Sequence, residues 1–123
     1  MSLSRISCAL LILVVSLVMP CFAFAQGQAI SLHGRSRVGD YAARLSSAER
    51  TWLNNKGTLT LGTSAPDYAP FDIVTPTLHY EGLTADYAKL LGDLLQVNIE
   101  VKRYDARVDA IQALKKGEID LLG

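Results

Sequence analysis

The chain has 123 residues, and 12 Lys and Arg side chains balance 12 Asp and Glu, so the formal net charge at pH 7 is zero. It contains no run of basic residues. This argues against nucleic acid as a partner, because binding to a phosphate backbone depends on clustered positive charge. Both cysteines, Cys8 and Cys21, precede residue 25. The rest of the chain therefore has no thiol for a disulfide, a zinc site or a nucleophile.

Residues 1–25 have the pattern of an export signal. Arg5 precedes an almost uninterrupted apolar run over residues 6–19, and an A-x-A cleavage site ends at Ala25. The sequence therefore predicts export to the periplasm and removal of this segment. Two alternatives stay open: an uncleaved membrane anchor, since the segment is nearly long enough to span a bilayer, and a lipoprotein anchored through Cys21.

Residues 26–45 show neither helical nor strand periodicity. We expect an extended leader or weak strand here, in which His33 is solvated. The spacing of Ser46 and Glu49 matches a capping box and predicts a short helix that ends at Gly57. We therefore expect the folded domain to span residues 46–123.

Residues 58–62 alternate polar and apolar side chains, which predicts a strand. Two short runs, residues 71–74 and 78–80, are separated by a turn sequence and indicate a hairpin. The next helix is expected to begin with Thr84 as its N-cap. Its predicted core-facing stripe comprises Leu83, Tyr87, Leu90, Leu91, Leu94 and Leu95.

Residues 97–101 alternate again and predict a second long strand. Asp105 is expected to cap a helix that ends at Gly117, and residues 119–122 form the third strand of the series. The predicted core-facing residues of this helix are Val108, Ile111 and Leu114. Because the chain stops directly after residues 119–122, we expect these elements to be the opening part of a larger domain.

Strands that alternate with helices of this length predict an α/β fold with a mostly parallel sheet. In such sheets ligands bind at the carboxyl ends of the strands. The loops that follow Leu61, Lys102 and Leu122 are therefore the expected binding site.

Residues 62–123 resemble the family 3 extracellular solute-binding proteins, which are two-lobed Venus flytraps. The resemblance rests on three motifs in order, DYAPF at residues 67–71, GLTAD at residues 82–86 and GEID at residues 117–120. Within that family the segment YEGLTADY at residues 80–87 is most similar to the first periplasmic domain of hybrid sensor histidine kinases of the BvgS/EvgS type. The resemblance implies a periplasmic-binding-protein-like (type II) fold, of which residues 46–123 form an incomplete first lobe.

The resemblance implies that the chain senses a small polar or anionic metabolite for a membrane-anchored kinase dimer. The alternative is a binding protein that delivers polar amino acids to an ABC permease. An enzyme built on the same fold, such as a dehydratase or the binding module of a transglycosylase, is a third hypothesis. The sequence contains none of the G-x-S-x-G, H-E-x-x-H or P-loop motifs. We therefore expect neither catalysis nor a cofactor from this chain.

Four residues are predicted to contact the ligand, each with a structural alternative. Tyr68 and Phe71 offer ring surface to an apolar, planar or cationic group, or else they plug the top of the lobe. Asp67 offers a carboxylate to an ammonium group, or else it orders its proline-flanked turn. Arg107 offers a guanidinium to a carboxylate, or else it is a surface arginine. His79 is expected to be a lone histidine, and we predict no metal site.

Overall fold

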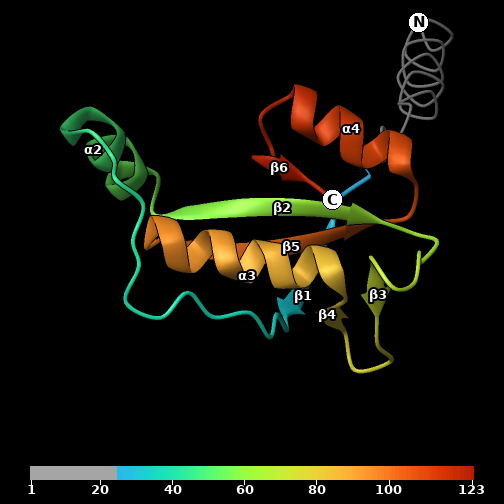
Figure 1. Cartoon of the computed structure of the whole chain (residues 1–123). Coiled ribbons are helices and arrows are strands. Elements are labelled where there is room, and N and C mark those ends of the chain that lie inside the picture. Colours follow the sequence, from blue (N-terminus) through green and yellow to red (C-terminus); the bar gives the residue numbers. More distant parts are fainter. Residues whose placement is uncertain (1–24) are drawn as a thin grey trace, which may run out of the picture.

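A six-stranded sheet forms the centre of the computed structural model, which describes residues 25–123 (Figure 1). The strands are β1 (Gln28–Leu32), β2 (Thr58–Ser64), β3 (Ile73–Val74), β4 (His79–Glu81), β5 (Asn98–Tyr104) and β6 (Leu121–Leu122). The helices are α2 (Ser47–Lys56), α3 (Leu83–Leu95) and α4 (Arg107–Lys115). The predicted export segment lies outside the described residues, apart from Ala25. None of the described helices has the length and hydropathy needed to cross a membrane.

The strands lie in the order β3-β4-β1-β5-β2-β6. The long strand β2 is parallel to β5 on one side and to β6 on the other, and β1 is parallel to β4. Only the β1–β5 pair and the short β3–β4 hairpin are antiparallel. The predicted α/β class, the mostly parallel sheet and the hairpin are therefore confirmed.

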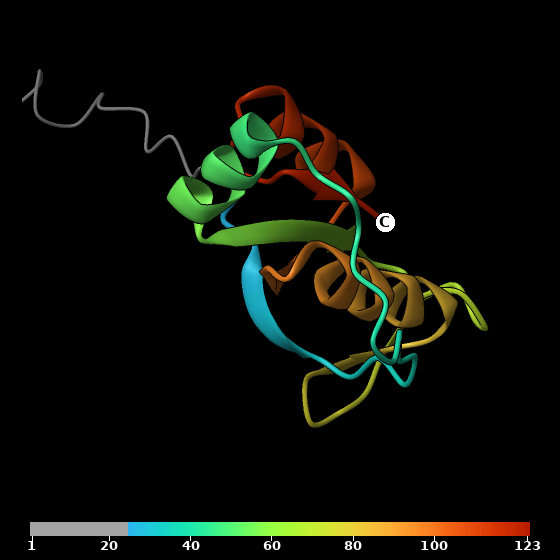
Figure 2. The same cartoon turned by 60° about the vertical axis from the view of Figure 1, so that its left-hand side comes forward.

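The segment that the sequence predicts as a leader contains β1, which lies inside the sheet between β4 and β5. Ile30 is buried there and pairs with Val101 of β5. The loop that follows β1 then runs along α3 (Figure 2), where the amide of Ala43 donates to the carbonyl of Leu94. Residues 26–45 are thus packed on the domain that was expected to begin at residue 46.

The predicted capping box is present at the start of α2. The Glu49 amide donates to Ser46 Oγ at 3.3 Å, and the Ser46 amide donates to Glu49 Oε2 at 2.7 Å. The hydrogen bonds from the Ser46 side chain and amide lower the pKa of Glu49 below its ordinary value. The helix ends as predicted at Gly57, whose amide donates to Leu53 and whose φ of 74° suits a glycine.

Neither of the other two predicted side-chain caps forms. Gly82, not Thr84, is the N-cap of α3, and the amides of Leu83 and Thr84 donate to the carbonyls of Pro70 and Phe71. A distant loop therefore satisfies the first helical N–H groups, which local side chains usually serve. Helix α4 follows Ala106 rather than Asp105, and its first turn has no side-chain cap.

The helices bury small residues against the sheet rather than the predicted large ones. In α3 the fully buried positions are Ala85 and Ala88, with Leu91 and Leu95 partly buried beside them. In α4 they are Ala110 and Ala113. Alanine lets a helix approach a sheet closely. The predicted core residues Leu83, Tyr87, Val108 and Leu114 are instead 37–64% exposed.

The two faces of the sheet carry separate apolar clusters, because side chains along a strand alternate between faces. Leu59 and Leu61 of β2 lie in the cluster with the alanines of α3. Gly62, the residue after Leu61, faces the other way, where a side chain would meet Ile119 and the ring of Tyr104, which pack with α4. Helices α3 and α4 accordingly lie on opposite sides of β2 (Figures 1 and 2).

Candidate ligand-binding site

The carboxyl ends of β2, β5 and β6 meet at one edge of the sheet. In the parallel register Ser64 pairs with Tyr104, and Gly62 pairs with Leu122. The loops after β2 and β5, and Gly123 after β6, therefore lie at the same edge, as the sequence predicts. A pocket of about 310 Å³ lies at this edge. It is lined by Thr63, Ser64, Ala65, Pro66, Tyr68, Asp72, Arg107 and Gly123.

Tyr68 lines this pocket from the loop after β2. A β-bridge to Asp72 holds its backbone: the Tyr68 amide donates to the Asp72 carbonyl at 2.8 Å, and the Asp72 amide donates back at 3.0 Å. The Tyr68 side chain is 69% exposed. Its backbone is thus fixed while its ring stays accessible to a ligand.

Phe71 lies next to the pocket rather than among the residues that line it. Its ring stacks on that of Tyr68, with the centroids 5.6 Å apart and the planes inclined by 15°. Offset stacking of this kind is a favourable arrangement of two aromatic rings. Of the two aromatic residues predicted to contact a ligand, Tyr68 lines the pocket and Phe71 stacks on the Tyr68 ring.

Asp67 is engaged by the protein itself. Its Oδ1 accepts from Arg103 Nη2 at 2.8 Å, and its Oδ2 accepts the amide of Val74 at 2.9 Å. It does not line the pocket. These contacts favour the structural alternative, in which Asp67 orders the loop between β2 and β3.

Arg107 lines the pocket from the first position of α4. The side chain is exposed, and Nη1 donates to the backbone oxygen of Gly123, which follows β6. This contact joins the start of α4 to the residue that follows β6. The guanidinium has five N–H donors in all, so others remain for a ligand.

Sequence reasoning missed two residues of this edge, Asp72 and Tyr80. Tyr80 is fully buried in β4, and its hydroxyl donates to Asp72 Oδ1. Burial raises the pKa of Tyr80 far above its ordinary value, and the hydrogen bond and negative charge of Asp72 raise it further. Hydrogen bonds with Thr63 and Thr84 oppose part of this shift. One signal in the sequence could have found Tyr80, namely the predicted hairpin strand over residues 78–80. Because side chains alternate along a strand, Tyr80 and His79 point to opposite faces of it.

The two histidines lie together, contrary to the sequence predictions. The rings of His33 and His79 stack with centroids 3.9 Å apart and planes inclined by 26°. His33 is therefore not simply solvated, and His79 is not alone. The two rings meet because β1 pairs with β4, which the sequence pattern did not indicate. Within residues 25–123 no group of three or more potential metal ligands is found.

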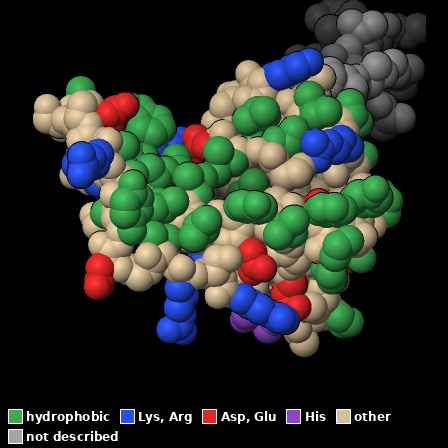
Figure 3. Space-filling model, in the orientation of Figure 1, with side chains coloured by type: hydrophobic (Ala, Val, Ile, Leu, Met, Phe, Trp, Pro, Cys, Tyr) green, Lys and Arg blue, Asp and Glu red, His purple; other side chains and the backbone are tan. Residues whose placement is uncertain are grey.

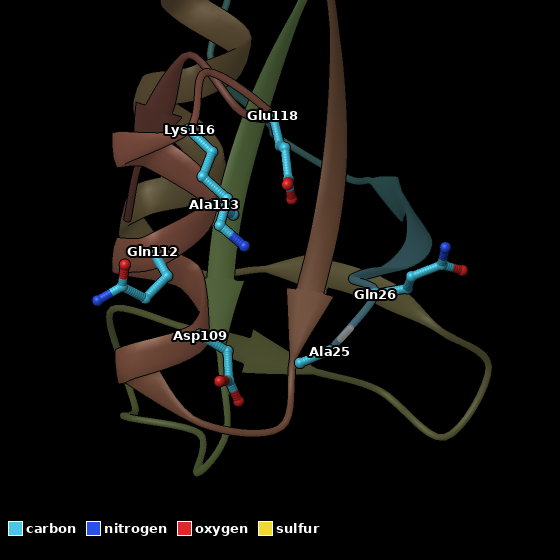
Figure 4. A pocket seen from close by; sticks show the side chains of 7 residues that line it. All are labelled: Ala25, Gln26, Asp109, Gln112, Ala113, Lys116 and Glu118. Atoms are coloured by element: carbon cyan, nitrogen blue, oxygen red, sulfur yellow. The ribbon is translucent and has the colours of Figure 1, made fainter. Parts of the chain in front are cut away.

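A second pocket, of about 400 Å³, lies between α4 and the start of the described chain (Figure 4). It is lined by Ala25, Gln26, Asp109, Gln112, Ala113, Lys116 and Glu118. Its lining contains no aromatic side chain and none of the four predicted site residues. It also includes no residue of β2, at whose carboxyl end ligands of such sheets bind. We therefore take the pocket beside Tyr68 as the candidate site.

The profile of the bacterial extracellular solute-binding proteins, family 3, matches residues 59–123. The chain therefore belongs to this family, as the sequence motifs predict. A further likeness is to the virulence sensor protein BvgS of Bordetella parapertussis, which is 44% identical over 110 residues. That alignment covers 87% of this chain and 9% of the relative. The sensor protein EvgS of Escherichia coli K12 is 29% identical over 79 residues, which is 64% of this chain and 7% of the relative.

Two solved structures share the fold. The crystal structure of the B. pertussis BvgS periplasmic domain matches with a TM-score of 0.72 and 43% identity, over 78% of this chain and 18% of that one. An ancestral cationic amino acid solute-binding protein matches with a TM-score of 0.51 and 33% identity, over 59% of this chain and 31% of that one. The predicted periplasmic-binding-protein-like fold is confirmed.

Proposed function

We propose that residues 46–123, together with β1, form part of lobe one of a periplasmic domain that senses a small polar or anionic metabolite. The observation that carries this proposal is the likeness to the BvgS periplasmic domain, at 43% identity over 78% of the chain. The partner in this proposal is a membrane-anchored kinase dimer, and residues 1–25 act as the export signal.

The proposed mechanism is a shift between open and closed states of a two-lobed domain. A ligand shifts such an equilibrium only by the difference between its affinities for the two states. In our proposal Tyr68 contacts the ligand from the loop after β2 and Arg107 contacts it from the first turn of α4, while Asp67 and Phe71 hold the loop that carries Tyr68. The described residues then contribute binding and not catalysis.

The alternative is a binding protein that delivers polar amino acids to an ABC permease. The likeness to the ancestral cationic amino acid solute-binding protein supports it, at 33% identity over 59% of the chain. That likeness covers less of the chain and has a lower TM-score than the likeness to BvgS. We therefore prefer the sensor.

A chimera tests the proposal. The matching 96-residue segment of B. pertussis BvgS is replaced by the residues of this chain, and kinase output is read from a promoter that the sensor controls. We expect the chimera to give regulated output, because the sheet and its loops replace their homologous counterparts. Tyr68→Ala should change that output at least several-fold.

The matched control is Tyr87→Ala. Tyr87 is 64% exposed, close to the 69% of Tyr68, but it lies on α3 and does not line the pocket. We expect this variant to behave like the unsubstituted chimera. A chimera that accumulates normally but whose output never varies would contradict the sensor proposal and leave the import alternative in place.

A further inference from the structure

The predicted export signal ends at Ala25, so its removal makes Gln26 the first residue of the mature chain. A terminal glutamine carries a nucleophile and an electrophile in the same residue. Its α-amine can attack Cδ of its own side-chain carboxamide and close a lactam ring. Because both reacting groups are held within one residue, the reaction is effectively unimolecular and is favoured by proximity. The surroundings of Gln26 in the fold then decide whether the ring can close.

The fold leaves Gln26 free to react. The residue is exposed and lies outside the sheet. It forms no hydrogen bond or ion pair with the part of the chain that the structure describes, residues 25–123. Figure 4 shows its side chain directed away from Asp109 and Gln112 of α4. No contact among these residues therefore holds the carboxamide away from the amine.

The chain is anchored directly after Gln26. Gly27 packs against the ring of Tyr104, where an added Cβ would lie 2.7 Å from the nearest ring atom, and Gln28 pairs with Arg103 as the first residue of β1. Strand β1 lies between β4 and β5, inside the sheet. Chain ends are preferred sites of proteolysis. Loss of only a few residues from this end would reach a strand that the sheet needs.

We propose that Gln26 becomes pyroglutamate once residues 1–25 have been removed. The α-nitrogen forms a bond to Cδ, the bond between Cδ and Nε2 breaks, and Nε2 leaves as ammonia with a proton that the amine gives up. The step needs no oxidant, reductant or co-substrate. It removes the positive charge of the terminus and the free amine that aminopeptidases require, so it protects β1 from trimming.

This inference goes beyond the proposed sensing function. It rests on one part of that proposal, the role of residues 1–25 as the export signal. The test uses the full chain, expressed with its own export segment in a bacterial host, purified from the periplasm and kept overnight at neutral pH. Intact-mass spectrometry compares the product with the mass calculated for residues 26–123. We expect one dominant species, lighter by one molecule of ammonia, and tandem mass spectrometry should place the loss at Gln26.

Three variants test the assignment to this residue. Gln26→Ala has no carboxamide and should keep its full calculated mass. Gln26→Glu should do the same, because a carboxylate is a much weaker electrophile than a carboxamide. The matched control, Gln28→Ala, removes another exposed glutamine, at the start of β1, and should lose ammonia as the unsubstituted chain does. A loss that persisted in Gln26→Ala, or that disappeared in Gln28→Ala, would overturn the assignment.

Digestion with a broad-specificity aminopeptidase tests the protection of β1. We expect Gln26→Ala to lose its terminal residue at least several-fold faster than the unsubstituted chain, because only the variant presents a free amine. Equal rates would contradict the protective role.

The mass also separates this inference from the proposal on which it rests. A chain that begins at Gln26 and keeps its full calculated mass would overturn the inference and support the export signal. A chain cleaved at another bond would likewise overturn the inference alone. A chain that still carries residues 1–25 would overturn both. The chimera experiment tests the sensing function independently of all three results.

Discussion

At the scale of single residues, Gly82 shapes the candidate binding edge through its backbone conformation. Its φ is 107°, a conformation that other residues rarely adopt, and a Cβ there would meet the carbonyl oxygens of Pro70 and Phe71. Those carbonyls accept the first amides of α3. One glycine therefore allows the loop that carries Tyr68 to dock on the N-terminus of the helix.

We predict that Gly82→Ala destabilises the chain by about 1–3 kcal/mol, because it combines backbone strain with a clash against backbone atoms. The free energy of unfolding is measured by urea denaturation. Gly117→Ala is the matched control: Gly117 also has a positive φ, of 73°, but a Cβ there meets no atom within 4 Å. Gly117→Ala should lower the free energy of unfolding by less than Gly82→Ala does. If it lowered the free energy of unfolding by as much or more, the role assigned to the docked loop would be wrong.

At the scale of elements, both ends of helix α2 are determined almost entirely by residues that are close together in the sequence. Its capping box and its terminal glycine are both visible in the sequence, and both form. The start of α3 is different, because its first two N–H groups are satisfied by carbonyls thirteen residues earlier in the chain. Local patterns predicted the presence of α3 and α4 but not how either begins.

We predict that Ser46→Ala lowers the stability of the chain by about 1 kcal/mol, because the Glu49 amide loses its side-chain acceptor. Thermal unfolding followed by circular dichroism measures the effect. Ser47→Ala is the control, since Ser47 is the first helical residue and alanine has the higher helix propensity. If Ser47→Ala proved as damaging as Ser46→Ala, the stabilising role of the cap would be wrong.

At the scale of the whole molecule, Asp120 joins the C-terminus of α2 to the sheet. Its Oδ1 lies 2.8 Å from Lys56 Nζ, and its Oδ2 accepts the amide of Thr60 at 2.9 Å. Burial alone would raise the pKa of Asp120, but the hydrogen bonds from Lys56 and Thr60 and the charge of Lys56 outweigh burial and lower it. The charged form is therefore favoured in the folded state.

This lowered pKa predicts a loss of stability in acid. The contribution of Asp120 is fully present above the unfolded-state pKa, about 3.9, and disappears as the pH falls through the lower folded-state value. As the pH falls from about 5 to about 2, the melting temperature should therefore fall less steeply in Asp120→Asn than in the unsubstituted chain. The melting temperature of the variant should already be the lower of the two at pH 5. Asp40→Asn, at an exposed loop position, should leave the slope unchanged. If the melting temperature of Asp120→Asn fell as steeply with pH as that of the unsubstituted chain, the link between the Asp120 pKa and stability would be wrong.

Several large apolar side chains are exposed on the helices. Trp52, Leu83 and Tyr87 are 44–64% exposed, and Figure 3 shows hydrophobic side chains gathered over the face that carries α2 and α3. A shallow apolar groove there is lined by Leu45, Ala48, Glu49, Trp52, Leu53 and Leu95. The sequence places Leu83 and Tyr87 at helical spacing, a pattern that predicts a core-facing stripe. Their exposure is visible only in the folded chain.

The sequence by itself determined the type and order of most elements, the family, and the sheet edge at which the candidate pocket lies. These follow from signals that act over a few residues, such as the Ser46 cap, the alternation in β2 and β5, and the glycines that end helices. Only the tertiary structure decided that β1 joins the sheet, that His33 stacks on His79, and that Asp72 rather than Asp67 faces the pocket. Those outcomes depend on pairing between segments far apart in the chain, which no local pattern encodes.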